Sequence, residues 1–398
     1  MSLIFFHIDV NSAFLSWSAI KTKTDHFDLR TIPSIIGGDQ NTRHGIVLAA
    51  SIPAKKFGIQ TGEPIANAFK KCPNLVIESP DMAFYKMCSQ KTMSLLSDIC
   101  PKIEQVSIDE CFMDYTFIQN GFSSPLDAAA FIKNKVRDEL GFTVNIGISD
   151  IKVFAKMASD FQKPDKVHTL YRSERNTKLW PLPIEKLYMC GKSSAATLRK
   201  LGITSIGELA TFNQDLIISH LKSHGLLLYQ YANGIDDNIT DTSEKTYKGI
   251  GNSTTLTEDA TSFDDIKPIL RTLSQSVALR LRKSEQLAGM VSIEIKYHDF
   301  SKTSHQTTLL EPTNTEQKIY QTACSLFCEL WDRSPVRLLG IRTSKLIPVS
   351  APIQLSLFPD KEDEKQQKLE QALHSIKTKF GTSSVIRGSE LKYPDHID

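Results

Sequence analysis

The order of apolar segments in the first 160 residues restricts the fold of this chain more than any other feature of the sequence. Nearly continuous apolar runs alternate with segments of helical periodicity. The patterns predict, in order, a strand at 3–10, a helix at 12–20, a helix from 83 to 100, a strand–turn–strand at 103–115, a helix at 126–140, a strand at 143–148 and a helix at 152–160. This order predicts an α+β fold in which helices cover one face of a sheet.

The rest of the chain divides into segments of different character, and 398 residues are enough for two to four domains. Residues 21–79 are mixed, residues 172–236 are mainly helical, and residues 237–247 form a polar linker. Residues 248–345 return to an α+β pattern, and residues 346–398 form a tail with a helical stretch ending near 380. Further strands are predicted at 35–38, 45–50, 290–297 and 336–341, and further helices at 265–283 and 316–331.

Composition excludes several classes of protein. Lys and Arg number 47 against 45 Asp and Glu, so nucleic-acid binding must rest on local clusters of basic residues and not on net charge. The seven cysteines are scattered without a Cys-x-x-Cys pair, which argues against a disulfide framework or a zinc site. The sequence has no signal-peptide pattern and no run of roughly 18 apolar residues. We therefore expect a cytoplasmic protein without a membrane partner.

Three carboxylates stand at the ends of predicted strands. Asp9 ends the first strand, where a charge is costly unless a cation or a hydrogen-bond donor binds it, although a lone Asp there is more often a strand-end cap. Asp109 and Glu110 are adjacent at the hairpin turn, and alone they would be an ordinary exposed acidic turn. Together on central strands, the three would supply hard oxygen ligands of the kind that Mg²⁺ binds. Two such ions about 3.5–4 Å apart support phosphoryl transfer.

Two lysine-containing segments are candidates for holding phosphate groups. One is Ser-Ile-Pro-Ala-Lys-Lys-Phe-Gly at 51–58, and the other is Gly-Ile-Ser-Asp-Ile-Lys-Val-Phe-Ala-Lys at 147–156, which continues to Gln-Lys-Pro-Asp at 162–165. Most lysines are solvated surface residues, so neither segment alone identifies a phosphate site. By the same reasoning, Phe14 alone is a core aromatic residue on a helix.

Five motifs, taken together and in this order, resemble the Y-family of translesion DNA polymerases, with its bacterial polymerase IV and polymerase V branches. They are Asp-Val-Asn-Ser-Ala-Phe at 9–14, Ala-Lys-Lys-Phe-Gly-Ile at 54–59, Ser-Ile-Asp-Glu-Cys-Phe-Met-Asp at 107–114, Gly-Ile-Ser-x-x-Lys-x-Phe-Ala-Lys at 147–156 and Lys-Pro-Asp at 163–165. The resemblance covers roughly residues 3–345 and is densest up to residue 170. It implies a multidomain α+β right-hand polymerase with a palm at 1–20 and 80–171, small fingers at 21–79, a helical thumb at 172–236 and an α+β little finger at 248–345.

The resemblance also implies a catalytic centre. Asp9, Asp109 and Glu110 would be the catalytic carboxylates, and with the backbone carbonyl of Val10 they would bind two Mg²⁺ ions. The motif departs from the polymerase IV pattern at Asn11, where that branch usually has Asp, and is nearer the polymerase V style. This difference removes none of the three carboxylates, so the resemblance still implies an active enzyme.

A nucleotide site is implied in the same way. Phe14, preceded by Ala13, would be the steric gate whose ring excludes a ribose 2′-OH, and Lys55 and Lys163 would contact the triphosphate. Ala13 stands where an aromatic residue is common. Ile52 and Lys55 stand where the family often has Tyr and Arg, and lysine cannot make the forked contact of arginine. These departures predict a weaker grip on the triphosphate.

A segment of the predicted thumb resembles a helix-hairpin-helix, a motif whose backbone N–H groups bind DNA phosphates. Its candidate DNA-binding residues are Gly191, Lys192 and Ser193. The usual second glycine is replaced by Lys192-Ser193, so the match is partial. A plain packing corner between two helices is the alternative.

The tail carries Gln354-Leu355-Ser356-Leu357-Phe358 between two prolines. Apolar residues in a polar tail need a partner, and this sequence resembles the pentapeptide by which bacterial polymerases bind the sliding clamp. Leu355, Leu357 and Phe358 would fill a pocket on the clamp, and Gln354 would hydrogen-bond at its rim. A strand that packs back on the core is the alternative.

These observations favour a monomeric, template-directed DNA polymerase that takes primer–template DNA, dNTPs and the bacterial sliding clamp as partners. The resemblance implies bypass of damaged template with low fidelity, and the modest basic charge predicts low processivity. A second hypothesis is a non-catalytic accessory protein that binds the clamp and DNA and retains the fold. A third, a palm-type nucleotidyl cyclase, would need neither the thumb nor the tail motif.

Overall fold

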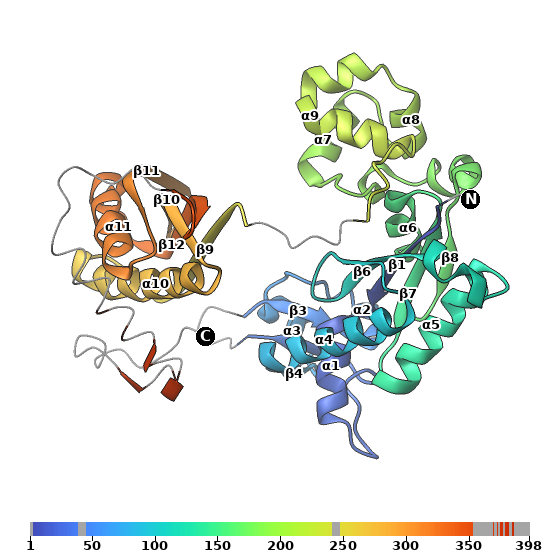
Figure 1. Ribbon diagram of the computed structural model, residues 1–398, viewed down its shortest axis with the longest axis horizontal. Coiled ribbons are helices and arrows are strands. Elements are labelled where there is room, and N and C mark those ends of the chain that lie inside the picture. The colour runs from blue at the N-terminus through green and yellow to red at the C-terminus, as the bar shows by residue number, and fades with distance from the viewer. Residues whose placement is uncertain are drawn as a thin grey trace. The chain divides into compact units, whose positions relative to one another are not determined.

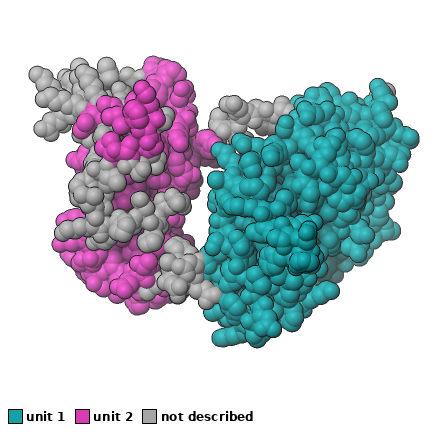
Figure 2. Space-filling model, turned by 90° about the horizontal axis from the view of Figure 1, so that it is seen from below, with its two compact units in different colours: residues 1–40, 45–244 teal, residues 41–44, 245–398 magenta. Residues whose placement is uncertain are grey.

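A computed structural model describes residues 3–38, 45–240 and 247–352, together with scattered positions between 369 and 385. The chain forms two compact units, coloured separately in Figure 2. The first unit consists of Met1–Gln40 and Gly45–Glu244, and the second consists of Asn41–His44 and Lys245–Asp398. The first unit includes the segments predicted as palm, fingers and thumb, and the second includes the predicted little finger.

The first unit is built around a five-stranded sheet with the strand order β5-β6-β1-β7-β8 (Figure 1). β1 is central and pairs antiparallel with both β6 and β7, because its run of apolar residues suits a position with neighbours on each side. β8 adds parallel to β7. The strands are β1 (Phe5–Val10), β5 (Ile103–Gln105), β6 (Glu110–Asp114), β7 (Val144–Ser149) and β8 (Val167–Thr169).

Helices lie against both faces of this sheet. Phe6 and Ile8 of β1 belong to a core shared with residues of α4 (Met82–Ile99) and α5 (Pro125–Leu140). His7 points to the opposite face, where its ring contacts Ser159 of α6 (Lys152–Ser159). The prediction that helices cover one face is therefore wrong. Successive strand residues alternate between faces, and α6 covers the face that carries the polar residues.

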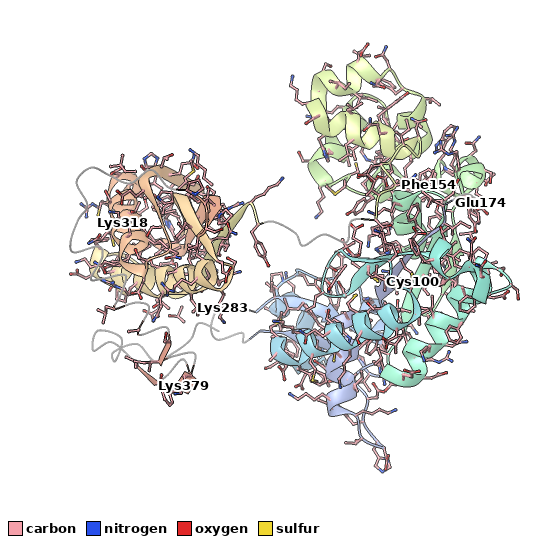
Figure 3. All side chains as sticks on the ribbon, viewed as in Figure 1. Cys100, Phe154, Glu174, Lys283, Lys318 and Lys379 are labelled. Carbon is pink, nitrogen blue, oxygen red and sulfur yellow. The ribbon has the colours of Figure 1, made fainter. Side chains whose placement is uncertain are left out.

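Gly147 sets how closely α6 approaches the sheet. A Cβ atom at this position of β7 would lie 2.0 Å from the carbonyl oxygen of Ala155 and 2.5 Å from the backbone nitrogen of Ser159. No larger residue fits without moving the helix, so α6 is held directly against β1 and β7. Phe154, labelled in Figure 3, lies on α6 and is fully buried.

The fingers segment contains a small sheet with the order β3-β2-β4 and its own core, which includes Ile35, Val47 and Ile65. Helix α2 starts at Ser51, whose hydroxyl accepts the backbone N–H of Ala54 at 3.1 Å. The helix α1 (Ala13–Thr22) leads into this segment, which contains β2 (Ser34–Gly37), β3 (Val47–Ala50), α2 (Ile52–Lys56), α3 (Ile65–Lys71) and β4 (Val76–Glu78).

The segment predicted as the thumb is helical, as expected from its sequence. Its main helices are α7 (Lys192–Lys200), α8 (Ile206–Thr211) and α9 (Gln214–Ala232). α9 is kinked at Lys222, which has φ 55° and ψ −141°. Gly225 follows the kink, and a Cβ there would lie 2.8 Å from the carbonyl oxygen of Ile217. Short helical turns of the first unit lie at Tyr115–Phe117, Gln119–Gly121, Arg172–Glu174, Arg175–Leu179 and Ile184–Lys186.

The chain leaving the thumb is fixed to the start of α6. Asp236 Oδ2 accepts the backbone N–H of Val153 at 2.9 Å, and Asn238 Oδ1 accepts that of Lys152 at 2.9 Å. These two side chains satisfy N–H groups that the first turn of a helix leaves free. Lys152 Nζ also donates to the carbonyl of Ile239 at 2.5 Å. The first residues of the segment predicted as a linker therefore contact α6, while residues 241–246 lie outside the described part of the chain.

The second unit is an antiparallel sheet with the order β11-β10-β12-β9, and two helices share a core with it. Ser262 and Asp265 form a capping box that starts α10, and Phe327 of α11 is fully buried in the core. The elements are β9 (Gly249–Ala260), α10 (Phe263–Lys283), β10 (Gln286–Tyr297), β11 (Lys302–Thr313), α11 (Glu316–Leu330) and β12 (Val336–Pro348).

Most predicted elements are confirmed within one to three residues at their ends, including most strands and helices of residues 3–160 and both helices of the second unit. β10 and β12 are longer than predicted. β9 and β11 escape prediction because they are rich in Ser, Thr and polar residues and bury few side chains. Within the described residues, no helix is long and apolar enough to cross a membrane.

Candidate active site

Asp9 and Glu110 face each other across two central strands. They are direct partners in the antiparallel register of β1 and β6, so their side chains lie on the same face of the sheet. Both carboxylates are largely buried, with side-chain exposures of 13% and 17%. Like charges opposite one another repel, so this pair requires a positive partner.

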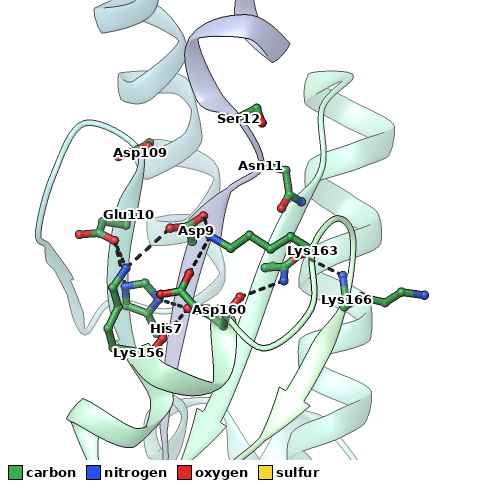
Figure 4. A network of polar contacts seen from close by, with 12 residues as sticks. His7, Asp9, Asn11, Ser12, Asp109, Glu110, Lys156, Asp160, Lys163 and Lys166 are labelled. Atoms are coloured by element: carbon green, nitrogen blue, oxygen red, sulfur yellow. Dashed lines mark hydrogen bonds and ion pairs between the residues drawn. The ribbon is translucent and has the colours of Figure 1, made fainter. Parts of the chain in front are cut away.

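Two lysines supply that positive charge (Figure 4). Lys156 on α6 pairs with Glu110 and lies 3.7 Å from Asp9 Oδ2. Lys163, in the loop after α6, donates to Asp9 Oδ1 at 2.7 Å and to Asp160 Oδ1 at 2.8 Å. The predicted triphosphate residue Lys163 is thus beside the predicted catalytic residue Asp9, although 154 positions separate them in the sequence.

A buried histidine lies beneath Glu110. His7 Nδ1 is 2.8 Å from Ser159 Oγ, and Nε2 is 3.4 Å from Glu110 Oε2. Burial lowers the pKa of His7, so the imidazole is neutral near pH 7. The contact with His7 and the ion pair with Lys156 outweigh burial and lower the pKa of Glu110 to about 2.

Asp109 directly precedes β6, and its carboxylate does not join the other two. Ser107 Oγ donates to Asp109 Oδ1 at 2.6 Å, while the Asp109 carbonyl accepts the backbone N–H of Val10 at 3.0 Å. This backbone bond continues the β1–β6 ladder and fixes Asp109 next to the end of β1. The structure therefore brings Asp9 and Glu110 together and places Asp109 at the adjacent turn, with its side chain held by Ser107.

The residues present fit a hard divalent cation by their chemistry. Three carboxylates and the carbonyl of Val10 are oxygen donors, which Mg²⁺ prefers over nitrogen or sulfur. Their side chains are not arranged as a metal site in this structure. Among the described residues, no three His, Cys, Asp or Glu side chains stand together in metal-binding geometry. Lysine ammonium groups contact the oxygens of Asp9 and Glu110.

Phe14 is half-buried on α1 and stacks on a second aromatic ring. Its ring centroid is 4.8 Å from that of Tyr85 on α4, with the planes 10° apart. Tyr85 is fully buried, and its hydroxyl is 2.6 Å from Ser18 Oγ. Ala13 is itself buried. The ring of Phe14 is therefore supported from behind by a residue that the motifs do not identify.

Lys55 extends from α2 of the fingers toward the end of β1. Its Nζ donates to Ser12 Oγ at 2.9 Å, and Ser12 has a left-handed backbone with φ 45°. Burial and the nearby charge of Lys163 lower the pKa of Lys55. Lys55 and Lys163 thus form a pair of neighbouring cations beside Asp9, as a site for an anionic group requires.

The remaining predicted site residues lie elsewhere. The start of α7 exposes Gly191, Lys192 and Ser193, and Gly191 is the N-cap residue of this helix. They stay a predicted DNA contact. The residues predicted to bind the clamp, Gln354, Leu355, Leu357 and Phe358, lie outside the described residues.

Comparison with known proteins assigns the chain to a family. Residues 8–160 match the impB/mucB/samB family, and residues 247–357 match its C-terminal domain. The chain belongs to the impB/mucB/samB family. The match to the family includes β1, β6 and α6, the elements that position Asp9, Glu110 and Lys156.

Relatives of this impB/mucB/samB protein extend over its full length. DNA polymerase IV of Clostridium acetobutylicum is 44% identical over 389 residues, covering 97% of this chain and 98% of the relative. DNA polymerase IV 1 of Bacillus subtilis is 35% identical over 395 residues, covering 98% and 94%. The solved structure of a Y-family DNA polymerase chimera matches with a TM-score of 0.77 at 22% identity, covering 87% of this chain and 99% of that one.

These matches confirm three predictions. The chain is a Y-family polymerase of the polymerase IV type, its fold class is the multidomain α+β right hand, and its enzyme class is DNA-directed DNA polymerase with a translesion role. The cyclase hypothesis is excluded by the same matches. Y-family polymerases use divalent metal ions, in agreement with the oxygen donors described above.

Sequence reasoning missed three residues of the site: His7, Tyr85 and Lys156. Lys156 stands within a quoted motif, but nothing in its spacing indicates that it meets Glu110, 46 positions away. The position of His7 could have been predicted, because residues two apart on a strand point to the same face of the sheet. A histidine two residues before Asp9 in an apolar strand must therefore lie on the same face as Asp9.

Proposed function

We propose that this chain extends a primer 3′ end on damaged template DNA by two-Mg²⁺ phosphoryl transfer, with low fidelity and low processivity. The observation that carries the proposal is the pairing of Asp9 and Glu110 on one face of the palm sheet, beside the neighbouring cations Lys55 and Lys163. Acidic oxygens for cations and basic groups for a triphosphate are the two components that such a reaction requires.

In the proposed reaction, the primer 3′ oxygen attacks the α-phosphorus of a dNTP. A new phosphodiester bond forms, the bond to the β-phosphate breaks, and pyrophosphate leaves. Asp9, Asp109, Glu110 and the carbonyl of Val10 would hold two Mg²⁺ ions, which when bound supply charge neutralisation at the reacting phosphate. Lys55 and Lys163 would hold the β- and γ-phosphates.

Phe14 would select nucleotides with deoxyribose over those with ribose. Its ring is stacked on the buried Tyr85, so it has little freedom to move aside for a 2′-hydroxyl group. In the proposal, a deoxyribose fits against this ring and a ribose collides with it. The sliding clamp would act through Gln354, Leu355, Leu357 and Phe358, and the chain would work as a cytoplasmic monomer.

Primer extension on a primed single-stranded template tests this proposal. We expect Asp109→Ala/Glu110→Ala to lose extension by at least about a thousandfold, because both remove charge from the reacting centre. The matched control is Asp138→Ala/Glu139→Ala, a second adjacent Asp–Glu pair that is exposed on α5. Extension by the Asp109/Glu110 variant at the rate of the control would contradict the proposal.

The sugar choice has its own test in the same assay. Phe14→Ala should incorporate ribonucleotides about tenfold to a hundredfold faster than wild type, while Phe131→Ala, which removes an exposed aromatic residue of α5, should not. No extension by folded wild type, even with the sliding clamp present, would instead favour the non-catalytic accessory protein.

A further inference from the structure

Lys156 has a place in the site for which the motif comparison gives no role. Its side chain is 14% exposed, and its Nζ lies between the two facing carboxylates, paired with Glu110 and 3.7 Å from Asp9 Oδ2. A lysine side chain is ordinarily protonated near neutral pH, and ion pairs with two carboxylates favour its charged form.

The surrounding contacts hold this lysine in place. Ser159 Oγ donates to the carbonyl of Lys156 at 2.8 Å and also contacts His7 Nδ1, so one turn of α6 is tied to β1. Gly147 keeps that turn directly against the sheet. The close-up in Figure 4 shows Lys156 and His7 converging on Glu110 from the α6 side. Of these two residues, Lys156 is the one whose nitrogen approaches both carboxylates as an ion pair.

We infer that Lys156 is a positioning residue that acts as an internal counter-ion: it holds Asp9 and Glu110 together and competes with divalent cations for their oxygens. The inference rests on the proposed metal-binding role of these carboxylates. Two carboxylates on directly opposed strand positions repel, and one ammonium group between them offsets this repulsion. A divalent cation that binds the same oxygens must displace that ammonium group or share the oxygens with it. The lysine therefore stabilises the fold and weakens cation binding.

Lys156→Met is the informative variant, because methionine keeps an unbranched apolar side chain and removes the charge. We expect its melting temperature without metal to fall below that of wild type. Mn²⁺ binding to the protein without DNA or nucleotide, measured by electron paramagnetic resonance of free Mn²⁺, should become about tenfold tighter. The rise in melting temperature on adding Mn²⁺ should be correspondingly larger. Lys156→Arg keeps the charge and should bind Mn²⁺ like wild type.

A purely structural role predicts the opposite change, because a loosened site binds cations less well. Unchanged or weaker Mn²⁺ binding by folded Lys156→Met would therefore overturn the inference. Lys135→Met, which removes the lysine of an ion pair with Glu139 on α5, is the matched control and should leave Mn²⁺ binding unchanged.

Asp9→Asn separates failure of the inference from failure of the proposed function. One outcome is that wild type binds Mn²⁺, that Asp9→Asn loses Mn²⁺ binding, and that Lys156→Met binds Mn²⁺ no more tightly than wild type. In that case only the counter-ion role fails. If Asp9→Asn leaves Mn²⁺ binding unchanged, these carboxylates are not the metal site, and the counter-ion role fails with the proposed function.

Discussion

At the scale of single residues, Lys222 in the middle of α9 has an unfavourable backbone conformation. Its φ of 55° and ψ of −141° fall in a region that glycine adopts readily and residues with a Cβ atom avoid. The kink lets the two parts of α9 pack closely at Gly225. The packing of the thumb core therefore stabilises a conformation that lysine itself disfavours.

Replacing Lys222 by glycine should stabilise the protein. Relief of the backbone strain is worth about 1 kcal/mol, which would raise the melting temperature by about 2–4 °C. Thermal unfolding measures the change. Lys222→Ala removes the same charge and keeps a Cβ atom, so equal gains in both variants would show that strain at this position is unimportant.

At the scale of elements, helix α8 depends on a capping box with one ionised partner. Glu208 Oε2 accepts the backbone N–H groups of Thr204 and Ser205 at 2.6 and 2.9 Å, and Ser205 Oγ accepts that of Glu208 at 3.2 Å. The backbone N–H groups of Thr204 and Ser205, and then the Thr204 hydroxyl, lower the pKa of Glu208 to about 2. A carboxyl whose pKa is lower in the folded than in the unfolded protein stabilises the fold only while it is ionised.

Glu208→Gln should therefore destabilise the protein in a pH-dependent way. The loss should be complete above pH 4.5, the ordinary pKa of a glutamate side chain, and should shrink as the pH falls through about 2, below which the wild-type side chain is uncharged like that of the variant. Urea unfolding at a series of pH values measures the difference. Ser205→Ala should cost about 1 kcal/mol with no such pH trend, and a constant loss in Glu208→Gln would contradict the assigned cause.

At the scale of the whole molecule, the sequence predicts what is periodic or carried by a motif. β1 is predictable because its apolar run is nearly continuous. Asp9 and Glu110 can be chosen as candidate site residues because the motifs that contain them occur in a fixed order. β11 is not predictable from the sequence, because its exposed Thr, Gln and His residues give no alternating pattern of apolar and polar side chains. The lysine contacts of the site are not predictable either, because they join residues 46 and 154 positions apart. Such contacts depend on how α6 packs on the sheet.

The tail motif makes a prediction for the complete chain. Leu357→Ala/Phe358→Ala should leave unaided primer extension unchanged and abolish its stimulation by the sliding clamp, because the apolar anchors supply most of the binding energy. Val349→Ala, which truncates an exposed apolar residue just after β12, is the control. Stimulation that survives the double substitution would locate the clamp contact elsewhere.

The bonds from Asp236 and Asn238 to the start of α6 fix the chain of the first unit almost to Thr240, the last residue described before residue 247. From Thr240 to Tyr247 the chain has seven peptide steps, which span at most about 25 Å. In the proposed function, each unit would contribute its own weak contact to the same duplex. Contacts joined by so short a stretch of chain would add as an avidity, so a polymerase with a net charge of only +2 would hold its template briefly and still release it.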